Sequence, residues 1–129
     1  MFKLFKKNQA TIPVVKEIPA AAGTYAVGQT LALNASGLVA QVAGTNVPTF
    51  VCASDATVLS GDVIAVNPIY EDMEFVTTFS ADGSALKAGA KVTIATTFDE
   101  VTATTTSGVA EIVEKLGTGA SGTEVIVKF

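Results

Sequence analysis

The sequence predicts an all-β protein, a small closed or partly closed β-barrel or sandwich with an extended N-terminal arm. Val, Thr and Ile supply 41 of the 129 residues, and these side chains favour pleated, half-buried surfaces. Short apolar runs alternate with Gly, Asn, Asp and Ser turn signals along most of the chain. Only 16% of the residues are charged, so part of the uncharged surface is expected to face a partner.

Residues 1–20 are predicted to form a basic arm, and residues 21–129 a single β-barrel domain. The first sixteen residues carry a charge of +4, whereas residues 17–129 carry four Lys and twelve acidic residues, or −8. Pro13 and Pro19 disfavour a continuous helix. Three interpretations stay open: a frayed basic terminus, an arm that lies across a neighbouring protein with Phe2, Leu4 and Phe5 as anchors, and a helix on a membrane surface.

The domain is predicted to begin with a hairpin. Leu31 and Leu33 lie on one face of a strand over residues 30–33, Ser36-Gly37 supplies a turn, and residues 38–42 alternate as the returning strand. After a loop at residues 44–46, a strand is expected over residues 49–53.

Residues 59–94 are predicted to contain the three strands around which the domain is organised. An apolar run covers residues 63–66, and a strand over residues 74–79 places Phe75 and Phe79 on one face. Asp82-Gly83 is a turn signal, and the alternation resumes over residues 91–94.

A glycine turn followed by a short strand recurs at Gly28, Gly61 and Gly89. The spacings of 33 and 28 residues are too uneven for a solenoid. They favour repeated returns of the chain into one closed sheet, with each glycine allowing a corner.

The last third of the chain is expected to continue in strands over residues 101–104, 109–113 and 124–129. Residues 109–116 also fit two helical turns, because their Glu and Lys residues suit a helix, but the strand is preferred. In the final strand Val125, Val127 and Phe129 are expected to face inward.

The absence of three residue types excludes much chemistry. The chain has no His, no Trp and no Arg, since all eight basic residues are Lys. Without His, the Ser-His and Cys-His pairs and most transition-metal sites are excluded. Without Arg, the bidentate reader of phosphate and guanine is missing, and the net charge of −4 adds repulsion from nucleic acid. We therefore expect no enzyme, no cofactor, no metal and no nucleic-acid partner.

Cys52 lies in an apolar run, which predicts a buried, reduced thiol and folding in a reducing cytoplasm. No stretch approaches the roughly 18 apolar residues that span a bilayer, and no apolar signal-peptide core precedes Pro13. The chain is expected to be soluble, not exported and without a membrane partner. The acidic clusters Glu71-Asp72-Glu74 and Asp99-Glu100 are interpreted as solvated turns rather than calcium sites.

A first resemblance covers about 35 residues. Gly61-Asp62-Val63-Ile64, the acidic turn at residues 71–74 and the later Gly and Lys pattern at residues 81–92 are similar to the hammerhead of biotinyl and lipoyl carrier domains. Those families carry a modifiable lysine in the hairpin turn. No lysine lies between Tyr70 and Phe79, so the attachment amine of a carrier is missing.

A second resemblance spans roughly residues 20–129. Its pattern runs through Val27-Gly28-Gln29, Pro48-Thr49-Phe50-Val51, the strand at residues 59–66, Leu86 to Val92, Gly108 to Val113 and the closing residues 125–129. This order of Ala-, Gly-, Thr- and Val-rich strands resembles the capsid decoration (cement) proteins of tailed bacteriophages, which are small β-barrel proteins.

This resemblance implies a virion structural protein without catalytic residues, made in the host cytoplasm. Its partner would be the major capsid protein, which it would bind on the outside of the phage head. On the shell it would form a homotrimer. The candidate capsid-binding residues lie in the basic arm: Phe2, Lys3, Phe5, Lys6 and Lys7. Deleting residues 1–16 is expected to weaken capsid binding and to leave the melting of the barrel nearly unchanged.

Two kinds of alternative stay open at this point. The nearest is another phage structural part, such as a head-fibre or tail base. A biotinyl- or lipoyl-like carrier, or a carbohydrate-binding β module, is the alternative from a different class.

Overall fold

The computed structural model of the chain describes residues 1–7 and 14–129, apart from the side chains of Lys6 and Lys7. Every regular element in this part of the chain is a strand, which confirms the all-β class. The strands are β1 (Lys3–Lys7), β2 (Lys16–Pro19), β3 (Gly23–Tyr25), β4 (Thr30–Leu33), β5 (Val39–Gln41), β6 (Phe50–Cys52), β7 (Ala56–Val58), β8 (Val63–Pro68), β9 (Met73–Thr78), β10 (Lys91–Val92), β11 (Ala110–Lys115) and β12 (Glu124–Lys128).

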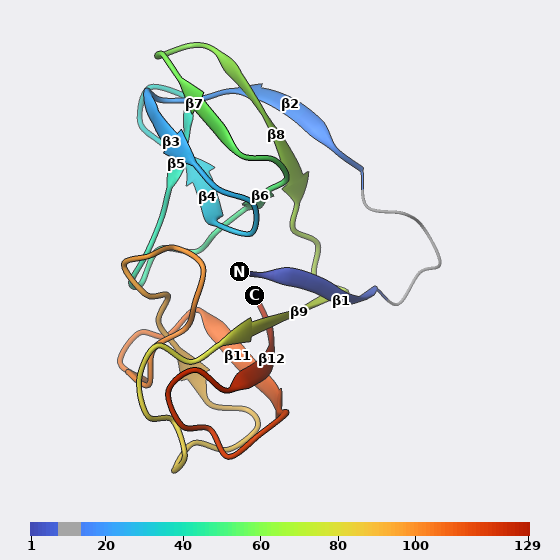
Figure 1. The fold of residues 1–129 in the computed structure, drawn as a ribbon, viewed down its shortest axis with the longest axis vertical. Helices are drawn as coiled ribbons and strands as arrows, with labels where there is room; N and C mark the ends of the chain where they lie inside the picture. Colours follow the sequence, from blue (N-terminus) through green and yellow to red (C-terminus); the bar gives the residue numbers. More distant parts are fainter. Residues whose placement is uncertain (8–13) are drawn as a thin grey trace.

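The strands gather into two lobes, one above the other in Figure 1. The first lobe, residues 16–68, holds the sheet β2-β8-β6-β4-β5 and the small sheet β3-β7. The second lobe, residues 73–129, holds β9-β12-β11-β10, and β1 is added at the outer edge of β9. All the strand pairs are antiparallel. None of these sheets closes into a barrel within the described residues, so the predicted single barrel is not confirmed.

Each lobe has its own hydrophobic core. In the first lobe the core side chains are Ala20, Tyr25, Leu31, Val39, Cys52, Ile64 and Val66. The core of the second lobe is larger and contains Met73, Phe75, Phe79, Val92, Ile94, Val101, Ala110, Ile112, Val125 and Val127. Two residues from outside the second lobe, Phe2 and Val51, complete it. The second core therefore depends on the N-terminus and on the first lobe.

Most of the strands predicted from alternation are found. The hairpin of β4 and β5 forms, and β11 is a strand and not a pair of helical turns. Met73, Phe75 and Thr77 are buried on one face of β9, and Phe79 follows them into the core, as expected for this face. The predicted strand over residues 101–104 was wrong: only Val101 is bridged, to Ile94 and Phe79, and the residues after it form no regular strand, although Thr102 and Thr104 still form backbone hydrogen bonds with Thr93.

Four β-turns of one design each lead into a strand. In each, the N–H of the fourth residue donates to the carbonyl of the first at 3.0–3.2 Å, and the third residue is a glycine with positive φ. The turns cover residues 26–29, 59–62, 87–90 and 120–123. Gly28 and Gly89 are 61 positions apart in the chain, and so are Gly61 and Gly122. The glycine turns therefore recur as two pairs at one offset, two turns in each lobe.

The strand pairing repeats with the turns. Residues 16–19 pair with residues 63–66 in the first lobe, and residues 75–78 pair with residues 124–127 in the same register in the second. The inner strands are also arranged in the same order. In the first lobe β4 lies between β6 and β5, and in the second lobe β10 lies between β11 and the segment at Val101, which is bridged to Ile94.

Isolated β-bridges at the end of each sheet also occur at corresponding positions in the two lobes. Ala20 forms a parallel bridge with Val39, and Phe79 forms one with Val101. Leu33 pairs with Val39 in the first lobe as Ile94 pairs with Val101 in the second. Since turns, register and bridges all coincide, the two lobes are two copies of one β module in tandem.

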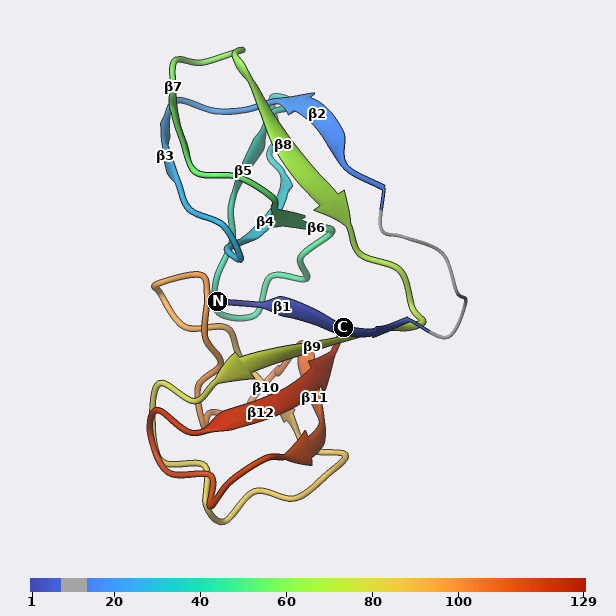
Figure 2. The same ribbon diagram turned by 45° about the vertical axis from the view of Figure 1, so that its right-hand side comes forward.

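β1 has no counterpart in the described part of the first lobe. It pairs with β9, 70 residues further along the chain, with Lys3 opposite Val76 and Lys6 opposite Glu74. Figures 1 and 2 both show β1 running along the boundary between the lobes. An extended arm is therefore not confirmed, because residues 3–7 form an edge strand and residues 16–19 form another. The domain boundary at residue 20 stays a prediction.

Candidate functional site

The ionisable side chains of the described residues form no reactive cluster. No group of three or more Asp, Glu, Cys or His side chains could hold a metal ion in this part of the chain. In the acidic cluster Asp99-Glu100, Glu100 accepts a hydrogen bond from the Thr78 hydroxyl at 2.7 Å, and Asp99 lies 3.8 Å from the amino group of Met1. These carboxylates make structural contacts and lack the neighbouring acid or base that catalysis requires.

Cys52 is a buried, free thiol, as the sequence predicts. Its Sγ donates to the Ser54 carbonyl at 3.2 Å. Burial raises the pKa of the thiol, and the negative charge of Asp55 raises it further. A nucleophilic cysteine needs the opposite, a stabilised thiolate, so Cys52 is a core residue of the first lobe.

The lobes are joined by backbone hydrogen bonds. Gly44 and Ile94 form an antiparallel bridge, in which each N–H donates to the other residue's carbonyl at 2.8 and 3.1 Å. The Thr30 N–H donates to the Phe98 carbonyl at 2.8 Å, and the side-chain amide Nε2 of Gln29 donates to the Thr97 carbonyl at 3.4 Å. The two lobes use different surfaces here: the first contributes a loop and the start of β4, and the second contributes Ile94 and the turn after it.

Phe2, one of the predicted capsid-binding residues, lies at this junction. Its side chain is only 3% exposed, and its ring centroid is 5.4 Å from that of Phe129. The Phe2 N–H donates to the Gly28 carbonyl at 3.0 Å. The Phe2 ring packs in the core of the second lobe, and its predicted role in capsid binding stays untested.

The approach of the N-terminus explains why residue 28 is a glycine. A Cβ at Gly28 would lie 2.1 Å from Cγ of Met1, and the φ of +84° already favours glycine. Its counterpart Gly89 has open space around it. The sequence marks both glycines as turns, but nothing in it shows that the N-terminus packs on the first of them.

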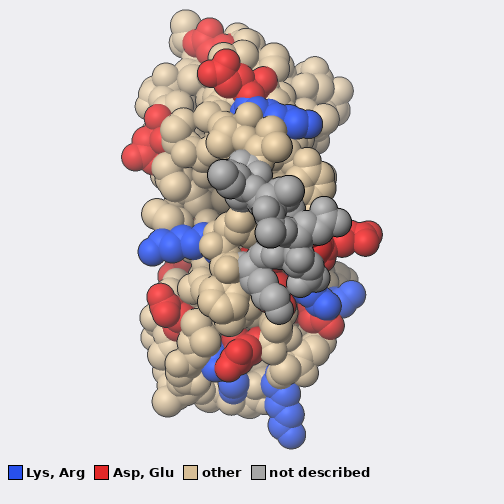
Figure 3. Space-filling model, turned by 90° about the vertical axis from the view of Figure 1, so that its right-hand side faces the viewer, with Lys and Arg blue, Asp and Glu red and all other residues tan. Residues whose placement is uncertain are grey.

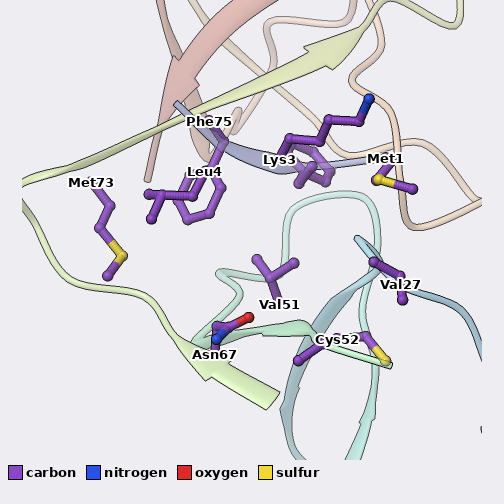
Figure 4. Close-up of a pocket in the computed structure, with 11 residues that line it drawn as sticks. Met1, Lys3, Leu4, Val27, Val51, Cys52, Asn67, Met73 and Phe75 are labelled. Atoms are coloured by element: carbon purple, nitrogen blue, oxygen red, sulfur yellow. The ribbon is translucent and has the colours of Figure 1, made fainter. Parts of the chain in front are cut away.

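A cleft of about 350 Å³ lies beside β1 between the lobes. Figure 4 shows Leu4, Met73 and Phe75 on the side of the second lobe, facing Val51 and Asn67 of the first. Its walls are mostly apolar, and the ionisable groups among its described lining residues are the Met1 amino terminus, Lys3 and the buried Cys52 thiol, with no carboxylate among them. The cleft has the character of a packing gap at the junction between the lobes.

The other predicted capsid-binding residues lie on β1. The side chain of Lys3 is exposed, and Phe5 is 55% exposed at the bulge between Leu4 and Lys6. Lys6 and Lys7 pair through their backbones with Glu74 and Met73, but their side chains lie outside the described part of the structure. Their predicted role is untested.

Phe5 is one of four exposed apolar side chains that lie on β1 or in the two residues just before β2. The others are Leu4 on β1 and Val14 and Val15 before β2, and we call the four the N-terminal apolar group. On the face of the molecule shown in Figure 3, charged side chains are scattered among broad uncharged areas. Edge strands of soluble monomers are normally protected by charges, so exposed apolar residues at such edges favour a partner.

The segment between β8 and β9 bears on the carrier resemblance. In a carrier domain the matching residues form a hairpin turn that presents the modified lysine. Here β8 and β9 belong to different sheets, so residues 69–72 connect the two lobes and present no hairpin.

No protein-family model matches the chain, and no curated protein matches it. No helix long and apolar enough to cross a membrane occurs in the described part of the chain.

Proposed function

We propose that this protein is a non-enzymatic virion structural protein that decorates the outside of a phage head and stabilises it. Its partner is the major capsid protein, and it sits on the shell as a homotrimer after synthesis in the host cytoplasm. The proposal rests on the resemblance over residues 20–129 and on the low proportion of charged residues. We also propose that each lobe is a partly closed sandwich and that residues near the N-terminus reach across the shell as an arm.

The observation that carries the proposal is the N-terminal apolar group. Leu4, Phe5, Val14 and Val15 are exposed on or beside the two outer edge strands, β1 and β2. Burying a large apolar side chain contributes roughly 1.5–3 kcal/mol, whereas an exposed ion pair contributes about 0–1 kcal/mol. We therefore assign more of the binding to these side chains than to the lysines of β1.

Decoration would stabilise the head by mass action. Surface that is buried only in the assembled shell adds binding free energy to the intact particle and none to dissociated subunits. The structural requirement is a docking surface on a rigid domain, and no catalytic group is needed.

Co-sedimentation with assembled heads that lack the protein tests this proposal. The wild-type chain is expected to sediment with the heads, and Phe5→Ala is expected to weaken binding more than Lys3→Gln at physiological salt, since salt screens exposed charges. Leu116→Ala in the second lobe is a matched control, because Leu116 is exposed at 47% but lies far along the chain from the N-terminal apolar group.

Three results would contradict decoration. The wild-type chain could fail to sediment with the heads, or it could bind only to tails or fibres, which would favour another phage structural part. A lipoyl or biotinyl adduct in native mass spectrometry would favour a carrier.

A further inference from the structure

The contact between the lobes joins two different surfaces of one repeated module. The first lobe contributes what we call its tail, the residues Gln29, Thr30 and Gly44. The second lobe contributes its head, the residues Ile94, Thr97 and Phe98. An interface of this head-to-tail type leaves one head and one tail unused in every chain.

The unused head is on the first lobe. The counterparts of Ile94 and Phe98 are Leu33 and Gly37, because the turn at residues 34–37 is closed by the same hydrogen bond as the turn at residues 95–98. Ile94 is 1% exposed beneath Gly44, whereas Leu33 is 56% exposed. In the described part of the chain, Leu33 has a strand partner on one side only, Val39.

The unused tail is on the second lobe. The turn at residues 43–46 corresponds to the turn at residues 105–108, since in both the N–H of the fourth residue donates to the carbonyl of the first. Thr106 therefore holds the second position of its turn, as Gly44 does, while the positive φ lies at Gly44 in the first turn and at Ser107 in the second. The sequence of this second turn, Thr-Thr-Ser-Gly, is uncharged, and an uncharged surface is what an apolar head would bind.

We propose that a second copy of this chain docks its second-lobe tail on the first-lobe head, repeating between chains the contact that joins the lobes within one chain. The Thr106 backbone of one copy would bridge to Leu33 of the next, as Gly44 bridges to Ile94. This inference specifies the surfaces of the proposed self-association. It rests on that part of the proposed function and not on capsid binding.

The contact between chains is weaker than the contact within one chain. The lobes of one chain are covalently linked, which gives an effective concentration in the millimolar range for short connections. Lys91 also replaces the buried Thr30 at the second tail, and no strand equivalent to β1 spans the contact among the described residues. Association is therefore expected at high concentration in solution, or where a shell gathers the copies.

Sedimentation velocity of the full chain at concentrations up to about 1 mM tests the proposal. The wild type is expected to form larger species as concentration rises. Leu33→Glu puts a charge on the head, and Thr106→Pro removes the backbone N–H of the tail at a turn position that tolerates proline. Each is expected to lower the association constant at least about tenfold. Leu59→Glu, at an exposed turn outside both surfaces, is expected to change nothing.

Mixing the two variants gives the decisive measurement. The tail of the Leu33→Glu chain and the head of the Thr106→Pro chain are both intact, so a mixture is expected to form one-to-one dimers and nothing larger. A contact that used one surface twice would give no such dimer.

The proposal is overturned if the wild type stays monomeric at about 1 mM, if Leu33→Glu associates like the wild type, or if the mixture forms no dimer. If the wild type stays monomeric but Leu33→Glu no longer sediments with heads, the first-lobe head binds the capsid protein instead. Self-contact is then wrong while decoration stands. Circular dichroism of each variant excludes unfolding as the cause.

Discussion

The two lobes share a strand order and four matching turns, yet they differ wherever one lobe meets the other. Val51 of the first lobe is buried against the second core, while Glu111 at the corresponding position is half-buried and pairs with Lys128 at 3.2 Å. Leu33 is exposed where Ile94 is buried. Turn glycines and core alternation are therefore enough to specify the module, and the side chains at each end decide whether that end meets protein or water.

The test with the largest expected effect is at Phe2, because β1 adds to the second lobe a strand that has no counterpart in the described part of the first lobe. Phe2→Ala is expected to lower the free energy of unfolding by about 3–5 kcal/mol, as for other buried phenylalanines. Hydrogen exchange should show protection lost in β9 and β12 more than in β8, since Phe2 packs in the second core. Urea unfolding measures the change in the free energy of unfolding, and hydrogen exchange measures the loss of protection in each strand.

Phe5→Ala is the matched control for stability. Phe5 is exposed at the bulge of the same strand, so its removal is expected to change stability by no more than about 0.5 kcal/mol. Equal effects of the two substitutions would mean that Phe2 is not a core residue. The burial of Phe2 also reverses the expectation that deleting residues 1–16 leaves the melting unchanged.

A second test uses a glycine pair with unequal surroundings. A Cβ at Gly83 would lie 2.7 Å from the Phe79 ring, whereas at Gly23, the matching position in the first lobe, the nearest atom is 3.8 Å away, on Tyr25. Gly83→Ala is expected to cost about 1–3 kcal/mol by overpacking, and Gly23→Ala close to nothing. Thermal unfolding of the two variants compares them.

Phe79 explains this difference, since its first-lobe counterpart is Ala20. In a Phe79→Leu background Gly83→Ala should therefore cost less than in the wild type. If Gly83→Ala is as harmless as Gly23→Ala in the wild type, the second lobe is less tightly packed than its core indicates.

Local signals in the sequence predict most of the strands. The alternation at β9 and the glycine turns act within a few residues, so they indicate the elements without any knowledge of the fold. The fourth turn, at residues 120–123, is hard to recognise from the sequence, because Gly117, Gly119 and Gly122 together with small polar residues are typical of a flexible loop. Recognising Ser121-Gly122 as the counterpart of Ser60-Gly61 would have shown the constant offset and the duplication.

The site residues were less predictable, because their surroundings come from distant parts of the chain. Phe2 and Phe5 look alike in the sequence, and only the pairing of β1 with β9 buries one ring and exposes the other. Leu33 shows no local difference from Ile94, since each ends a short strand. Leu33 is exposed because no other lobe covers it in the described structure, and the pattern of apolar residues in the sequence does not show which lobe end is covered.

A third test asks whether the modules are equivalent where nothing else touches them. Gly61 and Gly122 have φ angles of +92° and +83°, and a Cβ at either would meet no atom within 4 Å. Substitution by Ala is therefore expected to cost only the backbone term, about 1–2 kcal/mol in each case. Urea unfolding of the two variants should agree within about 0.5 kcal/mol, and a larger difference would mean that the turns are not equivalent.

The smallest expected effect separates the modules by pH. Cys52 in the first core corresponds to the buried aliphatic Ile112 in the second, as the pairing of β6 and β11 with their neighbours shows. Burial raises the pKa of the Cys52 thiol above that of the unfolded chain, so the folded state holds this proton more tightly. The thiol's contribution to stability is complete below the unfolded pKa of about 8.5 and is lost as the pH rises towards the folded pKa. Wild-type stability should therefore fall between about pH 8 and 9.5, and the stability of Cys52→Val should fall less over the same interval. Urea unfolding at half-unit steps of pH measures both slopes, and Val51→Ala, which alters the neighbouring side chain but keeps the thiol, should retain the wild-type slope. Identical slopes for the wild type and Cys52→Val would show that the thiol titrates as freely in the folded chain as in the unfolded one.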